Sequence, residues 1–337
     1  MRDELKENTP QEEIKEQKNE EDINSQLPSG EPIAKPTPET EDYGQTIENA
    51  RLDFSKAYKA SRRNSFIAMG VVMAFAVGAV VCIGQAGMVW RIVGWSLIGT
   101  ALLGMIIYYI VTHNAMPNAT KEYIKVVNDN LNMRNFADTQ FQDVTVDKNE
   151  KIELSDPISD AIYKDLSNIA SRNVVNGHFA GRSFKVADLG LYSGAGRNRV
   201  SAFVGKYFSY PNDLHFEGRY ILLEKGATPV DLPSDIDDLK PLVEDGNFII
   251  YGPEGGKPSS DLGDNLIKEI RKLKVQNHLL GYSLVFWSGH TSGYLSYDDA
   301  IMALPFEKKF DKEPNEQYAN DLLHLFNCLK QTVKKDK

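Results

Sequence analysis

Two long stretches of apolar residues dominate the hydropathy pattern near the N-terminal end of the chain. They run from Phe66 to Ile83 and from Ile92 to Val111, and neither contains Asp, Glu, Lys or Arg. A helix needs about 20 such residues to cross the hydrocarbon of a bilayer. A soluble helix of that length normally carries a polar stripe. The pattern therefore predicts two transmembrane helices, at about 66–84 and 91–111 within residues 65–112.

The two predicted spans are separated only by Gly84–Trp90, so we expect them to form an antiparallel helical hairpin. Small residues four positions apart favour close packing of the helices; the pairs are Ala74 with Gly78, and Ser96 with Thr100. Aromatic residues typical of the lipid headgroup region flank the spans; they are Trp90, Trp95, Tyr108 and Tyr109.

Basic residues predict the orientation of the hairpin. They are more frequent before the first span and after the second than in the link, whose edge carries only Arg91. The flanking residues are Arg51, Lys56, Lys59, Arg62, Arg63, His113, Lys121, Lys125 and Arg134. Because positive flanks stay in the cytoplasm, we expect a multi-pass protein of the cell (inner or plasma) membrane with both termini cytoplasmic. A long polar segment precedes the first span, so no signal peptide is expected.

The segments before the spans are polar. Residues 1–42 are acidic and proline-containing, without apolar periodicity, which predicts a disordered tail. That tail is either an interaction arm or, as we favour, a solubilising segment. Residues 43–64 predict a juxtamembrane helix that leads into the first span.

Residues 117–337 are long enough to form a cytosolic domain with its own core. Pro117 is expected to begin a helix, and Asp143–Glu153 reads as a linker. Ser155-Asp156-Pro157 is typical of a helix start, with an apolar face following; that face consists of Ile158, Ile162, Leu166 and Ile169.

After Phe179 the pattern changes to that of strands. Ser183–Tyr192, Val200–Tyr210 and Leu214–Glu224 predict a meander. Further strands are expected at Phe248–Tyr251, Tyr282–Trp287, Gly293–Tyr297 and Ile301–Phe306, and helices at Asp261–Lys274 and Asn315–Lys334. Strands bracketed by helices indicate an α+β domain with a mostly antiparallel sheet and flanking helices.

Charge and cysteine content narrow the functional classes. The formal net charge of −9 does not suggest a nucleic-acid partner. Cys82 lies in the first predicted span and Cys328 in the last predicted helix, so a disulfide between them is implausible. Both are interpreted as packing residues, which suits a reducing cytosol.

No motif for catalysis, cofactors or metals emerges. Gly252–Ser260 resembles a phosphate-binding loop, but its glycine spacing is short and Pro258 replaces the required Ser or Thr. Gly194-Ala195-Gly196-Arg197 reads as a hairpin turn. Pro241 and a missing glycine break the calcium-loop pattern of Asp235, Asp237 and Asp238. Ser288–Ser292 is expected to be a hairpin tip rather than a Ser/His catalytic pair.

The six histidines lack the spacing of metal ligands; they are His113, His178, His215, His278, His290 and His324. Arginine and lysine side chains among the strands could form a basic face, although solvated strand edges are the favoured interpretation; they are Arg182, Arg197, Arg199, Lys206 and Arg219.

Several short segments resemble an uncharacterised bacterial family of two-span membrane proteins, catalogued as domain of unknown function 3137. The segments are Gly181-Arg182-Ser183-Phe184, Phe203–Phe208, Phe216–Arg219, Val243–Tyr251, Tyr282–Tyr294 and Leu304–Glu307, within Ala60 to Phe310. Gly252–Leu262 stands where the family has an acidic stretch and Ala-Arg-Tyr. The resemblance implies two spans followed by a cytosolic domain, and no known activity.

The expected function is therefore a membrane-tethered interaction or assembly module, in contact with the lipid bilayer and with a protein partner or a second copy of itself. Two alternatives remain open. One is a membrane-associated enzyme, and the other is a sensor of a small ligand or lipid, each with a site assembled from residues distant in sequence. No catalytic, cofactor-binding or metal-binding residue is assigned.

Overall fold

The computed structural model describes residues 31–32, 42–85, 87–147, 149–194, 196, 199–225, 239–302 and 306–333. The chain divides into two compact units. The sheet unit contains residues 138–298 and 323–337 together with residues up to 33, and the helical unit contains residues 34–137 and 299–322. Most of the predicted tail, and the acidic turn at Asp235, Asp237 and Asp238, lie outside the described residues.

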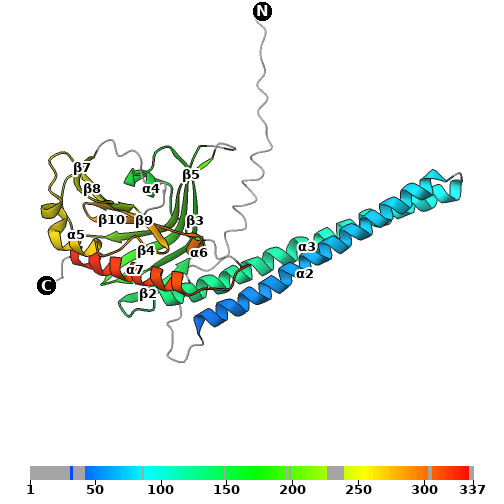
Figure 1. Ribbon diagram of the computed structural model, residues 1–337, viewed down its shortest axis with the longest axis horizontal. Coiled ribbons are helices and arrows are strands. Elements are labelled where there is room, and N and C mark those ends of the chain that lie inside the picture. The colour runs from blue at the N-terminus through cyan, green and yellow to red at the C-terminus, as the bar shows by residue number, and fades with distance from the viewer. Residues whose placement is uncertain are drawn as a thin grey trace, which may run out of the picture. The chain divides into compact units, whose positions relative to one another are not determined.

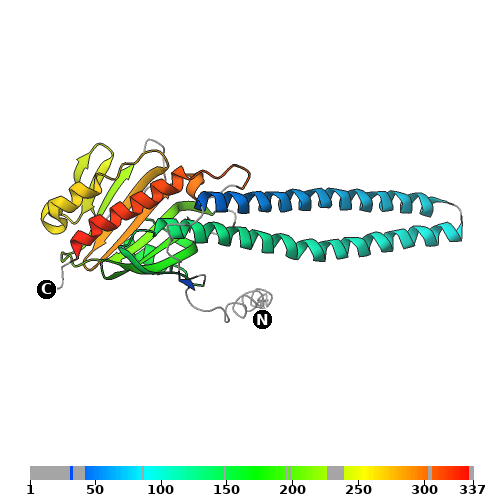
Figure 2. The same cartoon turned by 90° about the horizontal axis from the view of Figure 1, so that it is seen from below.

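The helical unit is built on two long helices, α2 (Tyr43–Gly84) and α3 (Met88–Asn135), which run side by side in opposite directions (Figures 1 and 2). The juxtamembrane segment and the first apolar stretch form one continuous helix. The prediction that a new helix begins at Pro117 is wrong, because α3 continues through this residue. Proline removes only one backbone donor, and a long helix retains the bonds on either side of it.

The two helices approach each other closely where Gly94 faces α2. A Cβ atom added at Gly94 would lie 2.6 Å from Ile83 Cγ1 and 3.0 Å from the carbonyl oxygen of Ala79. The hydroxyls of Ser96 and Thr100 instead donate to carbonyls of their own helix, those of Ile92 and Ser96. Gly94 therefore permits close packing here, and Gly78 of the predicted pairs also faces α3, since a Cβ atom added at Gly78 would lie 3.7 Å from Leu97 Cδ1.

The base of the helical pair is bound to residues 306–316. Arg51 Nη1 donates to the carbonyl of Phe306 at 2.9 Å, and the Phe310 amide donates to Glu48 Oε2 at 3.0 Å. The Arg51 guanidinium lowers the pKa of Glu48 to about 2. The strand predicted at Ile301–Phe306 is wrong, since Asp299–Met302 forms the short helix α6 and residues 303–305 lie outside the described part. Local β propensity there is overridden by these contacts with α2.

Within the residues that the structure describes, the sheet unit contains a ten-stranded sheet in the order β1-β2-β3-β4-β5-β10-β9-β6-β8-β7. All of its pairings are antiparallel, which confirms the predicted sheet type. The strands are β1 (Glu31–Pro32), β2 (Phe141–Asp147), β3 (Leu166–Phe179), β4 (Arg182–Ser193), β5 (Val200–Pro211), β6 (Arg219–Lys225), β7 (Lys240–Asp245), β8 (Phe248–Gly252), β9 (Leu279–Trp287) and β10 (His290–Tyr297).

Three predictions for this unit are wrong. The predicted linker from Asp143 contains most of β2. The predicted helix through Ile169 ends at Asp160, and Leu166 begins the 14-residue strand β3. The meander does not form, because β10 and β9 lie between β5 and β6. The apolar spacing of 158–169 suits a helix locally, but cross-strand pairing with β4 over most of β3 outweighs it.

Helices cover the two faces of the sheet differently (Figure 1). One face, called the α4 face, is covered by residues 150–165, which include α4 (Ser155–Asp160). The other, called the α7 face, is covered by α5 (Asp264–Ile270) and by the sheet-unit part of α7 (Glu313–Leu329). A π-helical turn, Ser259–Gly263, precedes α5, and the 3-10 turn Lys330–Thr332 follows α7.

Phe326 forms the centre of the core on the α7 face. Its ring is fully buried and lies 5.1–5.7 Å, centroid to centroid, from five other rings. These belong to Phe141, Phe179, Phe184, Phe208 and Tyr210, on β2 to β5. One helical side chain therefore joins four neighbouring strands.

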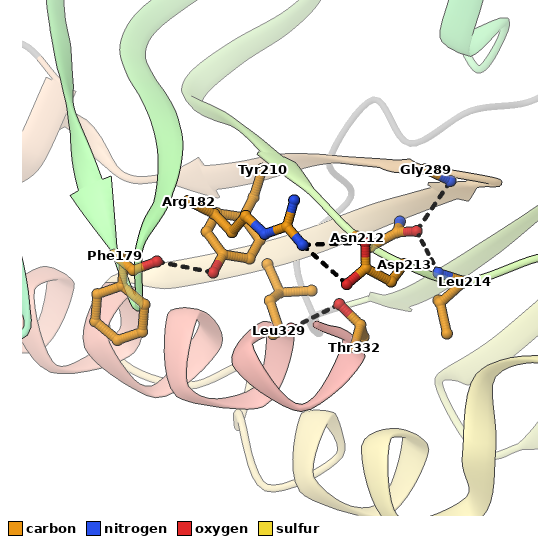
Figure 3. Close-up of polar contacts among 9 residues, drawn as sticks. All are labelled: Phe179, Arg182, Tyr210, Asn212, Asp213, Leu214, Gly289, Leu329 and Thr332. Atoms are coloured by element: carbon orange, nitrogen blue, oxygen red, sulfur yellow. Dashed lines mark hydrogen bonds and ion pairs between the residues drawn. The ribbon is translucent and has the colours of Figure 1, made fainter. Parts of the chain in front are cut away.

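Asn212 fastens the end of β5 to the β9–β10 hairpin (Figure 3). Its Oδ1 accepts from the amides of Leu214 and Gly289, both at 3.0 Å. Its Nδ2 donates to the carbonyl of Trp287 and the hydroxyl of Thr291. The adjacent Asp213 amide donates to the Thr332 carbonyl at 2.9 Å. The Asn212 side chain thus joins the end of β5 to the β9–β10 hairpin, and the adjacent Asp213 backbone amide joins it to Thr332 after α7.

We expect Asn212→Ala to lower the free energy of unfolding of the sheet unit by about 2 kcal/mol, because it leaves the partly buried amides of Leu214 and Gly289 without their acceptor. Urea unfolding followed by Trp287 fluorescence, in a chain carrying Trp90→Phe and Trp95→Phe, measures this change. The exposed Asn149→Ala serves as the matched control. Equal midpoints for the two variants would contradict the role given to Asn212.

Candidate functional site

An open concavity of about 470 Å³ lies on the α4 face of the sheet. Its lining residues come from β2, β3, β4, β5 and β10, and eight of the eleven have polar side chains; these are Asp143, Thr145, Asn176, His178, Ser183, Lys185, Ser209 and His290. Register explains the assembly, since Asn176 pairs with Lys185, Lys185 with Ser209, and Pro211 with His290. Side chains at paired positions share a face of the sheet.

Titratable side chains at this concavity occur in two close pairs, and one of them is an ion pair. Lys185 Nζ lies 2.5 Å from Glu150 Oε1, and Asn176 Nδ2 donates to Glu150 Oε2. His178 Nδ1 lies 3.7 Å from Asp143 Oδ2. With neutral histidines the local formal charge is −1, which comes from Asp143, a side chain that is 84% exposed. The surface therefore offers hydrogen-bonding groups rather than a strong field.

His290 connects the concavity to the protein interior. Its Nε2 lies 2.9 Å from Ser292 Oγ, and that hydroxyl donates to Asp160 Oδ1 at 3.2 Å. A hydroxyl carries one proton. The proton between His290 and Ser292 therefore belongs to Nε2, and Nδ1 is the acceptor nitrogen of the neutral ring.

Asp160 is buried at the end of α4, with 2% of its surface exposed. Besides Ser292, its carboxylate accepts from the Tyr294 hydroxyl at 2.6 Å and from Trp287 Nε1 at 3.2 Å. Burial raises the pKa of Asp160, and these hydrogen bonds oppose that shift. Burial and the nearby carboxylate also raise the pKa of Tyr294 well above its usual value. Three donors thus offset part of the desolvation of this carboxylate, and burial remains the larger effect on its pKa.

Arg219 holds the end of α4 against the sheet. Its Nη1 donates to the Asp160 carbonyl at 2.9 Å and its Nη2 to the Ala161 carbonyl at 3.2 Å. Its guanidinium lies over the Trp287 ring at 5.6 Å. Ala161 adopts a left-handed conformation with φ of 50°, which ends the helix there. Capping of the last carbonyls by a cation is favourable at a helix C-terminus.

The structure brings together two of the six histidines, His178 and His290, in the concavity. His278 instead pairs with Asp298 at 2.7 Å, His324 Nε2 lies 2.9 Å from the Glu269 carbonyl oxygen, and His215 is exposed. The side chain of His113 lies outside the described part. Among the described residues no group of three His, Cys, Asp or Glu side chains could hold a metal ion.

The Ser288–Ser292 segment does form the hairpin tip, with Ser288 and Gly289 between β9 and β10. Ser292 and His290 are in contact, but Ser292 is 1% exposed and donates to Asp160. In a Ser-His-Asp triad the histidine lies between serine and carboxylate, whereas here serine lies between the other two. This arrangement orients His290 and does not present Ser292 as a nucleophile.

The Gly252–Ser260 loop uses its amides internally. The Gly256 amide donates to the Pro253 carbonyl at 2.9 Å. The Lys257 amide donates to the Tyr220 hydroxyl at 3.1 Å and points toward Asp261 Oδ2 at 3.4 Å. Asp261, which also accepts from Tyr220, therefore lies where a phosphate cradle would place its anion.

Sequence reasoning missed Asp160 and its partners. Asp160 is the last residue of α4, whose start was predicted correctly. Nothing in the amino-acid sequence distinguishes Asp160 from the other acidic residues. Its donors come from β9 and β10, more than 120 positions away.

Comparison with known protein families finds no match, and comparisons with curated proteins and with solved structures find none either.

Proposed function

We propose that this chain is a two-span protein of the cell membrane, whose sheet unit is a cytoplasmic binding module rather than an enzyme. The observation that carries the membrane part is the exposure of apolar side chains on α2 and α3. Both helices are long and apolar enough to cross a membrane, and only 6% of the most apolar window of each is buried.

Water is an unfavourable solvent for this surface. Large side chains on both helices are more than half exposed; examples are Phe66 at 63%, Val80 at 72%, Trp95 at 66% and Leu103 at 59%. A core helix of a soluble protein would bury such residues, and a contiguous exposed apolar surface marks a membrane or protein interaction site. Because the apolar residues lie all around the helices, lipid is the solvent that suits them.

The assignment as a binding module is supported by the concavity. Its titratable side chains are engaged in pairs, and Ser292 is directed inward to Asp160. A sensor of a small ligand is the second candidate, because the concavity is open to solvent on the α4 face.

Cysteine labelling tests both the membrane crossing and the orientation. In a Cys82→Ser background, Gln85→Cys is expected to react with a membrane-impermeant maleimide in intact cells, whereas Glu244→Cys is expected to react only after permeabilisation. Cys328 needs no replacement, because burial raises the pKa of its thiol to about 12 and keeps it unreactive.

The Cys82→Ser chain without an added cysteine is the control for background labelling. Alkaline carbonate should leave the protein in the membrane fraction. Labelling of Glu244→Cys in intact cells would contradict the orientation, and release by carbonate would contradict the membrane crossing.

A further inference from the structure

We propose that the concavity on the α4 face binds a neutral, hydroxyl-rich small molecule of the size of a mono- or disaccharide, and that His290 Nδ1 accepts a hydrogen bond from one of its hydroxyls. This proposal is independent of the membrane crossing, because every residue involved belongs to the sheet unit.

Volume and composition favour such a ligand. The volume of about 470 Å³ lies within the range of small-molecule sites. Three hydroxyl side chains, Thr145, Ser183 and Ser209, and the amide of Asn176 line it from four adjacent strands. Hydroxyls both donate and accept hydrogen bonds, which complements a molecule carrying several hydroxyl groups.

Charge disfavours an ionic ligand. An anion would meet the carboxylates of Asp143 and Glu150, and the ammonium group of Lys185 in the described lining is already bonded to Glu150 at 2.5 Å. A cation would be repelled by the Lys185 ammonium, and its attraction to Asp143 is weak because that carboxylate is 84% exposed. Breaking the Lys185–Glu150 pair to admit either ion would leave a charge without its partner, whereas a neutral ligand leaves the pair intact.

The contact chain behind His290 gives that ring a defined hydrogen-bonding role. Asp160 accepts from Ser292, and Ser292 in turn accepts from Nε2 of His290. Nδ1 of the neutral ring is therefore an acceptor, which requires a donor such as a hydroxyl. Asp160 is buried and bonded to Tyr294 and Trp287. The hydrogen bonds from Asp160 through Ser292 to His290 are therefore formed before any ligand binds.

The test uses the full chain in lipid nanodiscs, with its histidines labelled with ¹³C at Cε1 and observed by NMR. The probes are glucose, N-acetylglucosamine, maltose, trehalose and myo-inositol, each titrated separately, with inorganic phosphate and methylammonium as charged comparisons. We expect at least one neutral probe to shift the His178 and His290 signals saturably, with a dissociation constant of about 1 mM. The signals of His278 and His324 should stay in place.

Two variants locate the binding. Ser183→Leu places a larger side chain at the exposed wall of the concavity and is expected to weaken binding at least tenfold, read from His178 and His290. Ser193→Leu, at the far end of the same strand, is its matched control. His290→Gln should weaken binding comparably, read from His178, whereas His278→Gln should leave affinity unchanged.

Trp287 fluorescence in each variant verifies that the sheet unit remains folded. The proposal is overturned if no neutral probe shifts His178 and His290, if only phosphate or methylammonium does so, or if all the histidine signals move together. It is also overturned if Ser183→Leu and His290→Gln both bind as tightly as the unmodified chain.

Discussion

Replacing Phe326 with alanine is expected to lower the free energy of unfolding of the sheet unit by about 3–5 kcal/mol, the range for truncating a buried aromatic residue. The ring is fully buried and contacts rings from β2, β3, β4 and β5. Its removal leaves a cavity between α7 and four strands that neighbouring aromatic rings are too rigid to fill. The loss therefore includes both transfer of the ring to water and the cost of the cavity.

Urea unfolding of the full chain in detergent, with Trp287 as the only tryptophan, measures this effect. Val200→Ala, whose side chain is 63% exposed on β5, is the control, with an expected change within about 0.5 kcal/mol. Phe326→Leu should lower the free energy of unfolding by less than Phe326→Ala, because leucine fills part of the volume of the phenylalanine ring. If Phe326→Ala and Val200→Ala unfold at the same urea concentration, Phe326 does not anchor this core.

Replacing Asp160 with alanine is expected to lower the free energy of unfolding by about 3 kcal/mol, since it leaves the donors of Tyr294, Ser292 and Trp287 buried without an acceptor. Asp160→Asn keeps one acceptor oxygen and should therefore lower the free energy of unfolding by less than Asp160→Ala. The same Trp287 assay measures both variants, and its emission also reports the loss of the indole hydrogen bond. Asp156→Ala, at a partly buried position on the same helix, is the control.

The contribution of Asp160 to the free energy of unfolding is expected to change with pH in one direction. Burial raises its pKa in the folded protein above the ordinary value of 3.8. The folded state then binds a proton more readily than the unfolded state, so this stabilising contribution is present below 3.8 and is lost as pH rises through the folded pKa. The unmodified chain should therefore gain stability relative to Asp160→Asn as the pH is lowered toward 3.8.

The quantity to compare is the difference in free energy of unfolding between the unmodified chain and Asp160→Asn. Glu48 affects the pH dependence in the opposite direction, and this difference removes its contribution. The Arg51 guanidinium lowers the pKa of Glu48, so its stabilisation is lost as the pH falls. Both chains share it equally. A raised pKa at Asp160 would be contradicted if the stability advantage of the unmodified chain over Asp160→Asn stayed constant with pH. It would also be contradicted if that advantage grew as the pH rose.

Elements whose signal is local were predictable from the amino-acid order. The absence of charge over Phe66–Ile83 and Ile92–Val111 predicted two long helices, and α2 and α3 contain them. Alternating β-branched and aromatic residues predicted β4, β5, β8 and the β9–β10 hairpin. In each case the pattern lies within a single element and needs no distant partner.

Elements that depend on distant partners were not predictable. Leu166–Phe179 has helical spacing at its start, yet it is a strand because β2 and β4 pair with its two edges. The concavity unites Asp143, Lys185 and His290, and Asp160 meets Trp287, only through the antiparallel register of a sheet in which β10 lies beside β5. Hydropathy and spacing describe neighbours along the chain, whereas burial of a carboxylate and alignment of an imidazole arise from cross-strand neighbours that only folding brings together.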